Sequence, residues 1–191
     1  MKIIGLTGGV GSGKSYVLNQ FNTKFKIPVY DADKEVSKLI MKPSFQQLIK
    51  EYFGEDSYIN GFYNKEKFRN LFSENEYAIK LMNTLVIPDM KKDILSWITE
   101  KDSAPFKVVE CALLFESHMN LYFEKIITVV APYELRVERL IKRGMGLRLI
   151  DMFMKIQTSD SEKELRSTYV INNLTIPETN FQVDEIFDDL C

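Results

Sequence analysis

The stretch LTGGVGSGKSY, residues 6–16, places four glycines in one short segment. Glycine in an ordered segment costs roughly 0.5–1 kcal/mol relative to alanine, so four of them need a structural reason. The spacing from Gly8 to Gly13, followed directly by Lys14 and Ser15, fits the pattern G-x-x-x-x-G-K-[ST] of the phosphate-binding P-loop. The stretch therefore predicts a loop that binds a nucleoside triphosphate.

The residues on either side of this stretch predict the strand and the helix that a P-loop joins. Residues 2–7 form a short apolar run typical of a buried parallel strand. After the loop, Val17, Leu18 and Phe21 recur at helical spacing, which predicts a helix packed on a sheet. The alternative is a glycine-rich turn that merely connects a strand to a helix, and the lysine, the serine and both flanks disfavour it.

The small residues of the loop allow successive backbone N–H groups to turn inward and form an anion-binding nest at a helix N-terminus. We expect Lys14 to contact the β- and γ-phosphates and Ser15 to bind Mg²⁺. The residues expected to bind the nucleotide are Gly8, Gly11, Ser12, Gly13, Lys14, Ser15 and Tyr16.

The composition is that of a globular chain. Its 191 residues suit one domain, 45% of them are hydrophobic, and no stretch approaches the ~20 apolar residues of a membrane span. The net charge of −2 argues against a nucleic-acid-binding surface. The first strand begins too early to leave room for a signal peptide, and Cys111 and Cys191 suggest neither a disulfide nor a zinc site. We therefore expect a cytoplasmic protein without nucleic-acid or membrane partners.

Short β-type runs alternate with helical patterns along the chain. This alternation predicts an α/β fold, a five-stranded parallel sheet with helices on both faces, in which ligands bind beyond the carboxyl ends of the strands. The β-type runs cover residues 2–7, 27–30, 106–111, 125–131 and 168–171.

The long segment between the second and third strands is mostly helical, with a turn predicted at Asn60-Gly61. It resembles a subdomain that covers a substrate and not a second independent domain. Its helices are expected near residues 33–42, 44–53, 65–73, 76–86 and 89–100.

Acidic residues follow two of the predicted strands. Asp31 and Asp33 point the same way on an extended segment, so both are expected to face the crevice beside the P-loop. There they could hold Mg²⁺ or accept a proton from an attacking hydroxyl, and the alternative for Asp33 is a cap on the helix starting at Lys34. Glu110, at the end of the third strand, could also organise Mg²⁺, or be a paired acid without that role. The expected metal ligands are Ser15, Asp31 and Glu110.

The segment after the third strand is apolar and then acidic. Leu114 and Phe115, followed by Glu116, are expected to wall a substrate pocket. Together with Asp33 they form the predicted substrate-binding set.

A basic helix precedes a segment punctuated by glycine. Arg136, Arg139 and Arg143 are spaced three and four residues apart, so they share one helix face. With Gly144 and Gly146 as a hinge, this arrangement favours a lid that closes arginines over a transferring phosphate. The alternative is a solvated basic face with i,i+4 ion pairs.

Several segments together resemble one known family over nearly the whole chain. They are GLTGGVGSGKS, VYDAD, FGEDSYINGFYN, ECALLFES, APYELRVERLIKR and QTSDSEKELRSTYVINN, in the order seen in dephospho-CoA kinases. The LLFE and DAD elements separate this family from other P-loop kinases more sharply than the P-loop does. The resemblance implies transfer of the ATP γ-phosphate to the ribose 3′-hydroxyl of dephospho-CoA, the last step of coenzyme A synthesis, with ATP and Mg²⁺ as cofactors.

The resemblance also implies roles for individual residues. Asp33 is the expected base and Lys14 contacts the phosphates. Arg139 and Arg143 are expected to contact phosphate from the side of the lid, which makes these four residues the predicted catalytic set.

The resemblance further implies a CoA-binding helical insertion, approximately residues 33–103, and a lid, approximately residues 143–165. Two positions depart from the family's pattern. Ile87 stands where the family usually has histidine, and Phe153 stands where it tends to have an arginine of the lid.

Two other functions remain open at this point. Another small-molecule kinase, such as a nucleoside monophosphate kinase, would use the same loop, and a degenerate homologue that binds nucleotide and regulates would fit the two departures. A switch GTPase fits poorly, because the chain has no N-K-x-D segment to bind guanine.

Overall fold

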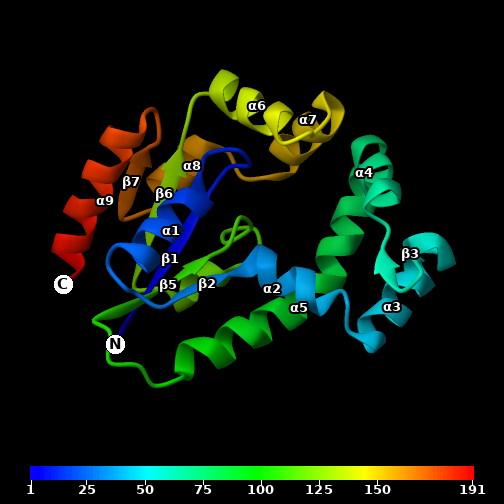
Figure 1. Cartoon of the computed structure of the whole chain (residues 1–191), viewed down its shortest axis with the longest axis horizontal. Helices are drawn as coiled ribbons and strands as arrows, with labels where there is room; N and C mark the ends of the chain where they lie inside the picture. Colours follow the sequence, from blue (N-terminus) through cyan, green and yellow to red (C-terminus); the bar gives the residue numbers. More distant parts are fainter.

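Strand β1 (Lys2–Gly8) lies at the centre of a five-stranded parallel sheet. It pairs with β5 (Phe106–Glu110) on one side and β6 (Lys125–Val130) on the other, while β2 (Val29–Asp31) and β7 (Tyr169–Asn172) form the two edges. The computed structural model describes residues 1–191 and confirms the predicted α/β fold with its five parallel strands (Figure 1).

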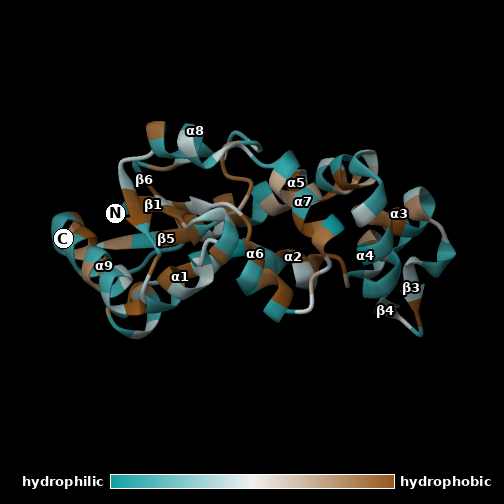
Figure 2. Ribbon diagram, turned by 90° about the horizontal axis from the view of Figure 1, so that it is seen from above, coloured by the Kyte–Doolittle hydropathy of each residue, from teal (hydrophilic) through white to brown (hydrophobic).

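Helices cover both faces of this sheet. On one face, α1 (Lys14–Thr23) and α9 (Ile176–Leu190) pack beside each other and bury the largest apolar cluster of the molecule. On the other face, the second half of α5 (Glu76–Thr99) contributes Met90 and Ile94 to a second buried cluster. The strands between these layers are strongly hydrophobic, as Figure 2 shows. No helix of the fold is long and apolar enough to cross a membrane.

The segment between β2 and β5 extends away from the sheet and has a small core of its own (Figure 1). Phe45, Ile49, Phe68 and Met82 are among the residues that form this core. Its elements before α5 are α2 (Ala32–Leu39), α3 (Pro43–Phe53), the 3₁₀ helix Glu55–Ser57, β3 (Tyr58–Ile59), β4 (Phe62–Tyr63) and α4 (Lys65–Glu74).

The hairpin β3–β4 confirms the turn predicted at Asn60-Gly61. Asn60 has φ 51° and Gly61 has φ 80°, and this pair of positive φ angles is what a two-residue type I′ turn requires. Asparagine and glycine are the residues that adopt such angles at least cost.

The prediction of two helices over 76–86 and 89–100 is wrong. The structure has one helix, α5, with Pro88 in its interior. A proline removes one helical hydrogen bond and crowds the preceding turn, which bends a helix without having to end it. The helix changes direction along its length in Figure 1, and its two parts pack on different cores, Val86 on that of the insertion and Met90 on that of the sheet.

The segment between β6 and β7 holds three short helices. They are α6 (Tyr133–Lys142), α7 (Leu147–Ile156) and α8 (Asp160–Leu165). Helix α7 contacts α4 of the insertion, whereas α8 contacts β6 of the sheet. This segment therefore bridges the sheet and the insertion.

Candidate active site

The loop between β1 and α1 has the backbone of a phosphate cradle. Gly8 has φ 150°, and a Cβ there would lie 2.2 Å from the carbonyl oxygen of Val129. Gly13 has φ 101°, and a Cβ there would lie 1.9 Å from Nδ2 of Asn173. Both ends of the motif thus need glycine, for conformation and for space. Between them, Ser12 is buried and its hydroxyl has no hydrogen-bond partner.

The two polar residues that end the motif differ in their surroundings. Lys14 begins α1 and is 8% exposed, with its Nζ 3.3 Å from the carbonyl oxygen of Gly9 and 3.9 Å from Oε1 of Glu110. Ser15, beside it, is exposed. Its hydroxyl lines a pocket of about 700 Å³ together with Asp31.

Tyr16 differs from the other predicted nucleotide-binding residues. Its hydroxyl donates a hydrogen bond of 2.7 Å to Oδ1 of Asn180 on α9. Its backbone N–H donates to Gly13 within the loop. The side chain of Tyr16 is therefore occupied in joining α1 to α9.

The sheet register brings the predicted acids together. Asp31, the last residue of β2, pairs with Glu110, the last residue of β5, and Glu110 also pairs with Leu6 of β1. The carboxyl ends of these three neighbouring strands meet beside the P-loop. Asp33 follows in the first turn of α2.

Asp31 and Asp33 have different local roles. Oδ1 of Asp31 accepts the backbone N–H of Lys34 at 3.1 Å and caps α2, while Oδ2 lies 3.0 Å from the ammonium of Lys34. The helix therefore begins two residues earlier, at Ala32, than the cap considered for Asp33 would require. The carboxylate of Asp33 does not cap the helix.

Both acids next to Lys14 hold their protons more tightly than usual. Burial raises the pKa of Glu110 to about 8; Lys14 opposes this rise, while Asp33 and Asp31 add to it. Loss of bulk water within the concave site raises the pKa of Asp33, again against the charge of Lys14 and with that of Asp31. These two carboxyls and one ammonium form a coupled charge cluster at the P-loop.

The donor set at this edge suits Mg²⁺. Glu110 has a buried carboxylate oxygen without a hydrogen-bond partner, and the Ser15 hydroxyl is open to solvent. The protein has no group of three or more His, Cys, Asp or Glu side chains that could hold a metal by itself. Mg²⁺ in kinase sites takes one or two protein ligands and completes its shell with phosphate oxygens and water.

The segment after β5 corrects part of the predicted substrate-binding set. Leu114 is 0% and Phe115 is 3% exposed, and both belong to the core under the sheet. Their side chains pack against the face of the sheet, so they do not line an open pocket. Glu116 has a different role in the structure: its Oε1 accepts the backbone N–H of Thr158, just after α7, at 2.6 Å.

The three predicted arginines divide between two environments. The guanidinium of Arg139 donates to the carbonyl oxygens of Ser12, at 3.3 Å, and Asn173, at 3.1 Å, so it braces the P-loop against the end of β7. Arg136 is buried and its Nε donates to the carbonyl oxygen of Val10 at 2.8 Å. Arg143, at the end of α6, is exposed to solvent.

Sequence reasoning missed two hydrogen bonds that hold the backbone of the P-loop. Val10 donates its backbone N–H to Oε1 of Gln157 at 2.8 Å. Asn173 donates from Nδ2 to the carbonyl oxygen of Ser12 at 2.7 Å. Nothing in the local sequence around Gln157 or Asn173 indicates these bonds, because their partners lie about 150 residues away along the chain.

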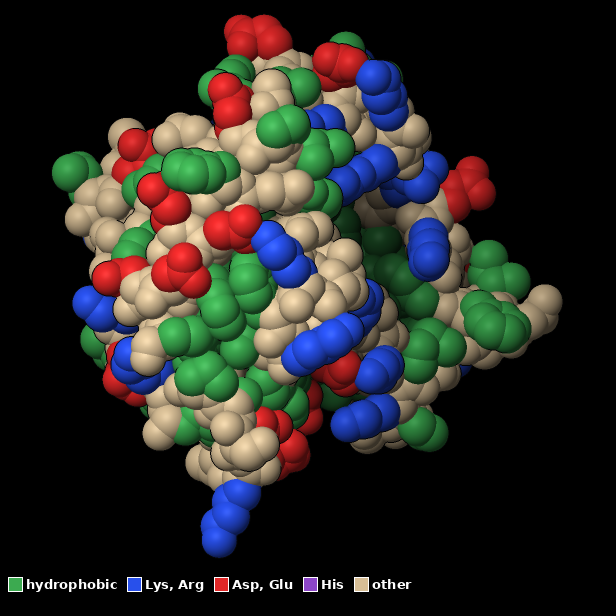
Figure 3. Space-filling view, turned by 60° about the vertical axis from the view of Figure 1, so that its left-hand side comes forward, with side chains coloured by type: hydrophobic (Ala, Val, Ile, Leu, Met, Phe, Trp, Pro, Cys, Tyr) green, Lys and Arg blue, Asp and Glu red, His purple; other side chains and the backbone are tan.

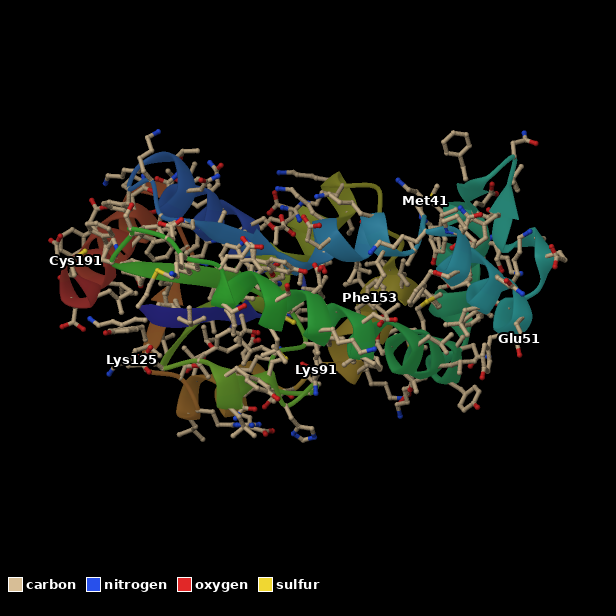
Figure 4. The ribbon with its side chains drawn as sticks, turned by 90° about the horizontal axis from the view of Figure 1, so that it is seen from below. Met41, Glu51, Lys91, Lys125, Phe153 and Cys191 are labelled. Atoms are coloured by element: carbon tan, nitrogen blue, oxygen red, sulfur yellow. The ribbon has the colours of Figure 1, made fainter.

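Helix α7 lies against the insertion. The Nζ of Lys155 is 2.6 Å from Oε2 of Glu76, at the start of α5. Phe153, on the same helix, is half-buried and lies in Figure 4 between the sheet part, which ends at Cys191, and the insertion, which carries Glu51. Figure 3 shows a hollow on the surface, with hydrophobic side chains in its depth and Lys and Arg side chains around it.

The site combines a strand, a glycine-rich loop and a helix arranged to bind phosphate. A carboxylate that caps no helix lies beside the lysine of the loop. This combination is that of the P-loop kinases as a class. Solved structures share this fold. TT1252 from Thermus thermophilus superposes with a TM-score of 0.79 at 24% identity, covering 100% of this chain and 98% of its own. Dephospho-CoA kinase from Campylobacter jejuni superposes with a TM-score of 0.66 at 18% identity, covering 98% and 96%.

The sequence comparison identifies the family. The model of the dephospho-CoA kinase family matches residues 2–178. A dephospho-CoA kinase of Ehrlichia chaffeensis is 32% identical over 100% of this chain and 96% of its own length. The chain belongs to the dephospho-CoA kinase family.

Proposed function

We propose that this enzyme transfers the γ-phosphate of ATP to the 3′-hydroxyl of dephospho-CoA. The observation that carries the proposal is the meeting of Lys14, Asp33 and Glu110 at one end of the sheet, beside a loop shaped for phosphate. The family membership gives the acceptor, and the cluster gives the groups that the chemistry needs.

The chain's own residues divide the reaction between them. The backbone of the loop and the ammonium of Lys14 hold the β- and γ-phosphates and neutralise the charge that develops as the γ-phosphoryl group transfers. The carboxylate of Asp33 accepts the proton of the 3′-hydroxyl as its oxygen forms the new bond to phosphorus, and the bond to the β-phosphate oxygen breaks to release ADP. The raised pKa of Asp33 makes it a stronger base than an ordinary aspartate.

Ser15 and Glu110 would hold Mg²⁺ on the triphosphate, and the ion would supply further positive charge there. Asp31 is less available, because its two oxygens cap α2 and pair with Lys34. The metal would therefore be held chiefly by the Ser15 hydroxyl and by the oxygen of Glu110 that has no hydrogen-bond partner.

Two further segments complete the proposal. The insertion, approximately residues 33–103, takes the pantetheine and nucleotide parts of the acceptor, and the segment of approximately residues 143–165 closes over the phosphates. The core of the insertion and the ion pair between Lys155 and Glu76 support this division. The unpaired cysteines Cys111 and Cys191 favour a reducing compartment, the cytoplasm.

An acceptor panel tests the proposal. ADP release is measured with ATP and Mg²⁺ in the presence of dephospho-CoA, AMP, CMP or shikimate, each with the wild type and with Lys14→Ala. We expect fast release with dephospho-CoA and nearly none with Lys14→Ala. Faster release with a nucleoside monophosphate would assign the chain to another kinase, and no release with any acceptor would favour a regulatory homologue.

A further inference from the structure

A buried lysine lies near the P-loop without a hydrogen-bond partner. Lys163 on α8 is 0% exposed, and its Nζ makes no hydrogen bond. A buried ammonium is costly unless it is paired and hydrogen-bonded, so its presence requires an explanation. The sequence gives no hint of its burial, since Lys163 stands among Asp160, Glu162 and Glu164 in a polar run.

The nearest anion, Glu116, is an incomplete partner. Its Oε1 lies 3.6 Å from the Nζ of Lys163, beyond hydrogen-bond distance. The same Oε1 accepts the backbone N–H of Thr158 at 2.6 Å, and Oε2 is buried without any partner. Glu116 therefore keeps Lys163 charged without satisfying its three donors.

Helix α8 is fixed to the P-loop through Arg136, and Lys163 belongs to this helix. Asp160 accepts a hydrogen bond of 2.6 Å from the Arg136 guanidinium, which also donates to Val10 of the loop. Lys163 follows Asp160 by three residues and so lies on the same face of the helix, one turn further along.

The charge of Lys14 also acts on Lys163. Burial lowers the pKa of Lys163, Glu116 and Asp160 oppose the change, and the charge of Lys14 lowers the pKa further. Two ammonium groups that repel each other are both stabilised when an anion binds to them.

We propose that Lys163 is a second phosphate-binding cation, held by Glu116 while the site is free, whose ammonium moves from Glu116 to the γ-phosphate when ATP occupies the P-loop. Lys14 then approaches the triphosphate from α1 and Lys163 approaches it from α8. This inference rests on the proposed phosphoryl transfer, and its test by binding does not require turnover.

Nucleotide binding measures the proposed contact directly. Isothermal titration calorimetry with Mg²⁺ and either the β,γ-imido analogue of ATP or ADP gives the ratio of the two affinities for each variant. For Lys163→Met we expect the affinity for the imido analogue to fall about tenfold or more, the loss of one charge-assisted hydrogen bond, while the affinity for ADP changes less than about threefold. Lys163→Arg should restore part of the ratio. Lys142→Met, which removes an exposed lysine paired with Glu138 on α6, is the matched control and should leave the ratio unchanged.

If the ion pair of Lys163 with Glu116 serves only the stability of the fold, the binding experiment gives a different result. Glu116→Gln keeps an acceptor for Thr158 but releases Lys163, so the proposal predicts unchanged or tighter binding of the imido analogue relative to ADP. Equal loss of both affinities in Lys163→Met and in Glu116→Gln, accompanied by lower melting temperatures, would overturn it. If Lys163→Met does not fold, Glu116→Gln alone decides. An unchanged or higher affinity for the imido analogue relative to ADP supports the proposal, and a lower one overturns it. Inactivity of the wild type toward dephospho-CoA would refute the proposed function and leave this binding test intact.

Discussion

The carboxylate of Asp31 accepts the backbone N–H of Lys34 at 3.1 Å, and this single bond decides which of two neighbouring acids is free for chemistry. An aspartate that caps a helix is fixed in position by the backbone and is tied to folding. Asp33, two residues later, has no bond of this kind and lies beside Lys14 and Glu110. The structure thus separates a structural acid from an acid that can accept a proton.

Substitution of each acid in turn should show this separation. Asp33→Asn is expected to lower kcat by about 100-fold or more, because an amide cannot take the proton, with little change in the melting temperature. Asp31→Ala removes the cap and should lower the free energy of unfolding by roughly 0.5–2 kcal/mol. Thermal unfolding and steady-state kinetics on both variants check the pair. The reverse pattern, with Asp33→Asn unstable and active, would assign the cap to Asp33.

The buried carboxyl of Glu110 predicts a dependence of stability on pH. Its pKa in the folded protein, about 8, lies above that of an ordinary glutamate, so the folded state binds the extra proton and stability is lost as pH rises from about 4.5 to about 8. Glu110→Gln should remove this loss. In the presence of EDTA, we expect the variant to match the wild type near pH 4.5 and to exceed it at pH 8.5 by about 1 kcal/mol or more.

Denaturant unfolding at several pH values measures the effect of Glu110→Gln. The exposed Glu124→Gln serves as the control, since it changes the same charge on the surface. A Glu110→Gln variant that is less stable than the wild type at pH 8.5 would show that Lys14 holds Glu110 ionised in the folded protein.

Substitution of Arg139 and substitution of Arg143 should have different effects on stability and on catalysis. Arg139 donates to the carbonyl oxygens of Ser12 and Asn173, so Arg139→Ala should lower both the melting temperature and the affinity for ATP. Arg143 is exposed and is predicted to reach the phosphates when the lid closes. Arg143→Ala should therefore lower kcat by about tenfold or more without loss of stability, because an arginine at the transferring phosphate stabilises the charge of the transition state. Normal kcat in Arg143→Ala would remove it from the catalytic set.

Phe153 offers a gain-of-function test. It is half-buried on α7, between the sheet and the insertion, where the family tends to have arginine (Figure 4). Phe153→Arg should raise kcat several-fold, because a guanidinium at this position adds positive charge near the transferring phosphate. Lys155→Arg, on the same helix, keeps its charge and should have no effect. An unchanged or lower kcat in Phe153→Arg would show that the apolar contact of α7 matters more than the missing charge.

Local sequence was sufficient for the features that depend on backbone conformation. The P-loop and the Asn60-Gly61 turn were predictable because positive φ angles leave few choices of residue. Pro88 misled the prediction, since packing on two cores holds α5 together across a residue that usually ends a helix.

The residues that complete the site were beyond local reasoning. Gln157 accepts a hydrogen bond from Val10, which lies 147 residues away along the chain, and Lys163 looks like a solvated charge until the fold buries it. Conversely, the apolar Leu114 and Phe115 gave no sign of whether they cover a sheet or line a pocket. Spacing alone does not encode which tertiary neighbour a side chain meets.

Identification of the phosphorylated atom tests the central claim most directly. Dephospho-CoA, ATP and Mg²⁺ are incubated with the enzyme, and the products are examined by ³¹P and ¹H NMR. The account predicts one new phosphomonoester signal coupled to the ribose H3′, formed in equal amount with ADP and absent with Asp33→Asn on the same timescale. Release of ADP with inorganic phosphate alone, or a phosphate on any other oxygen of the acceptor, would contradict it.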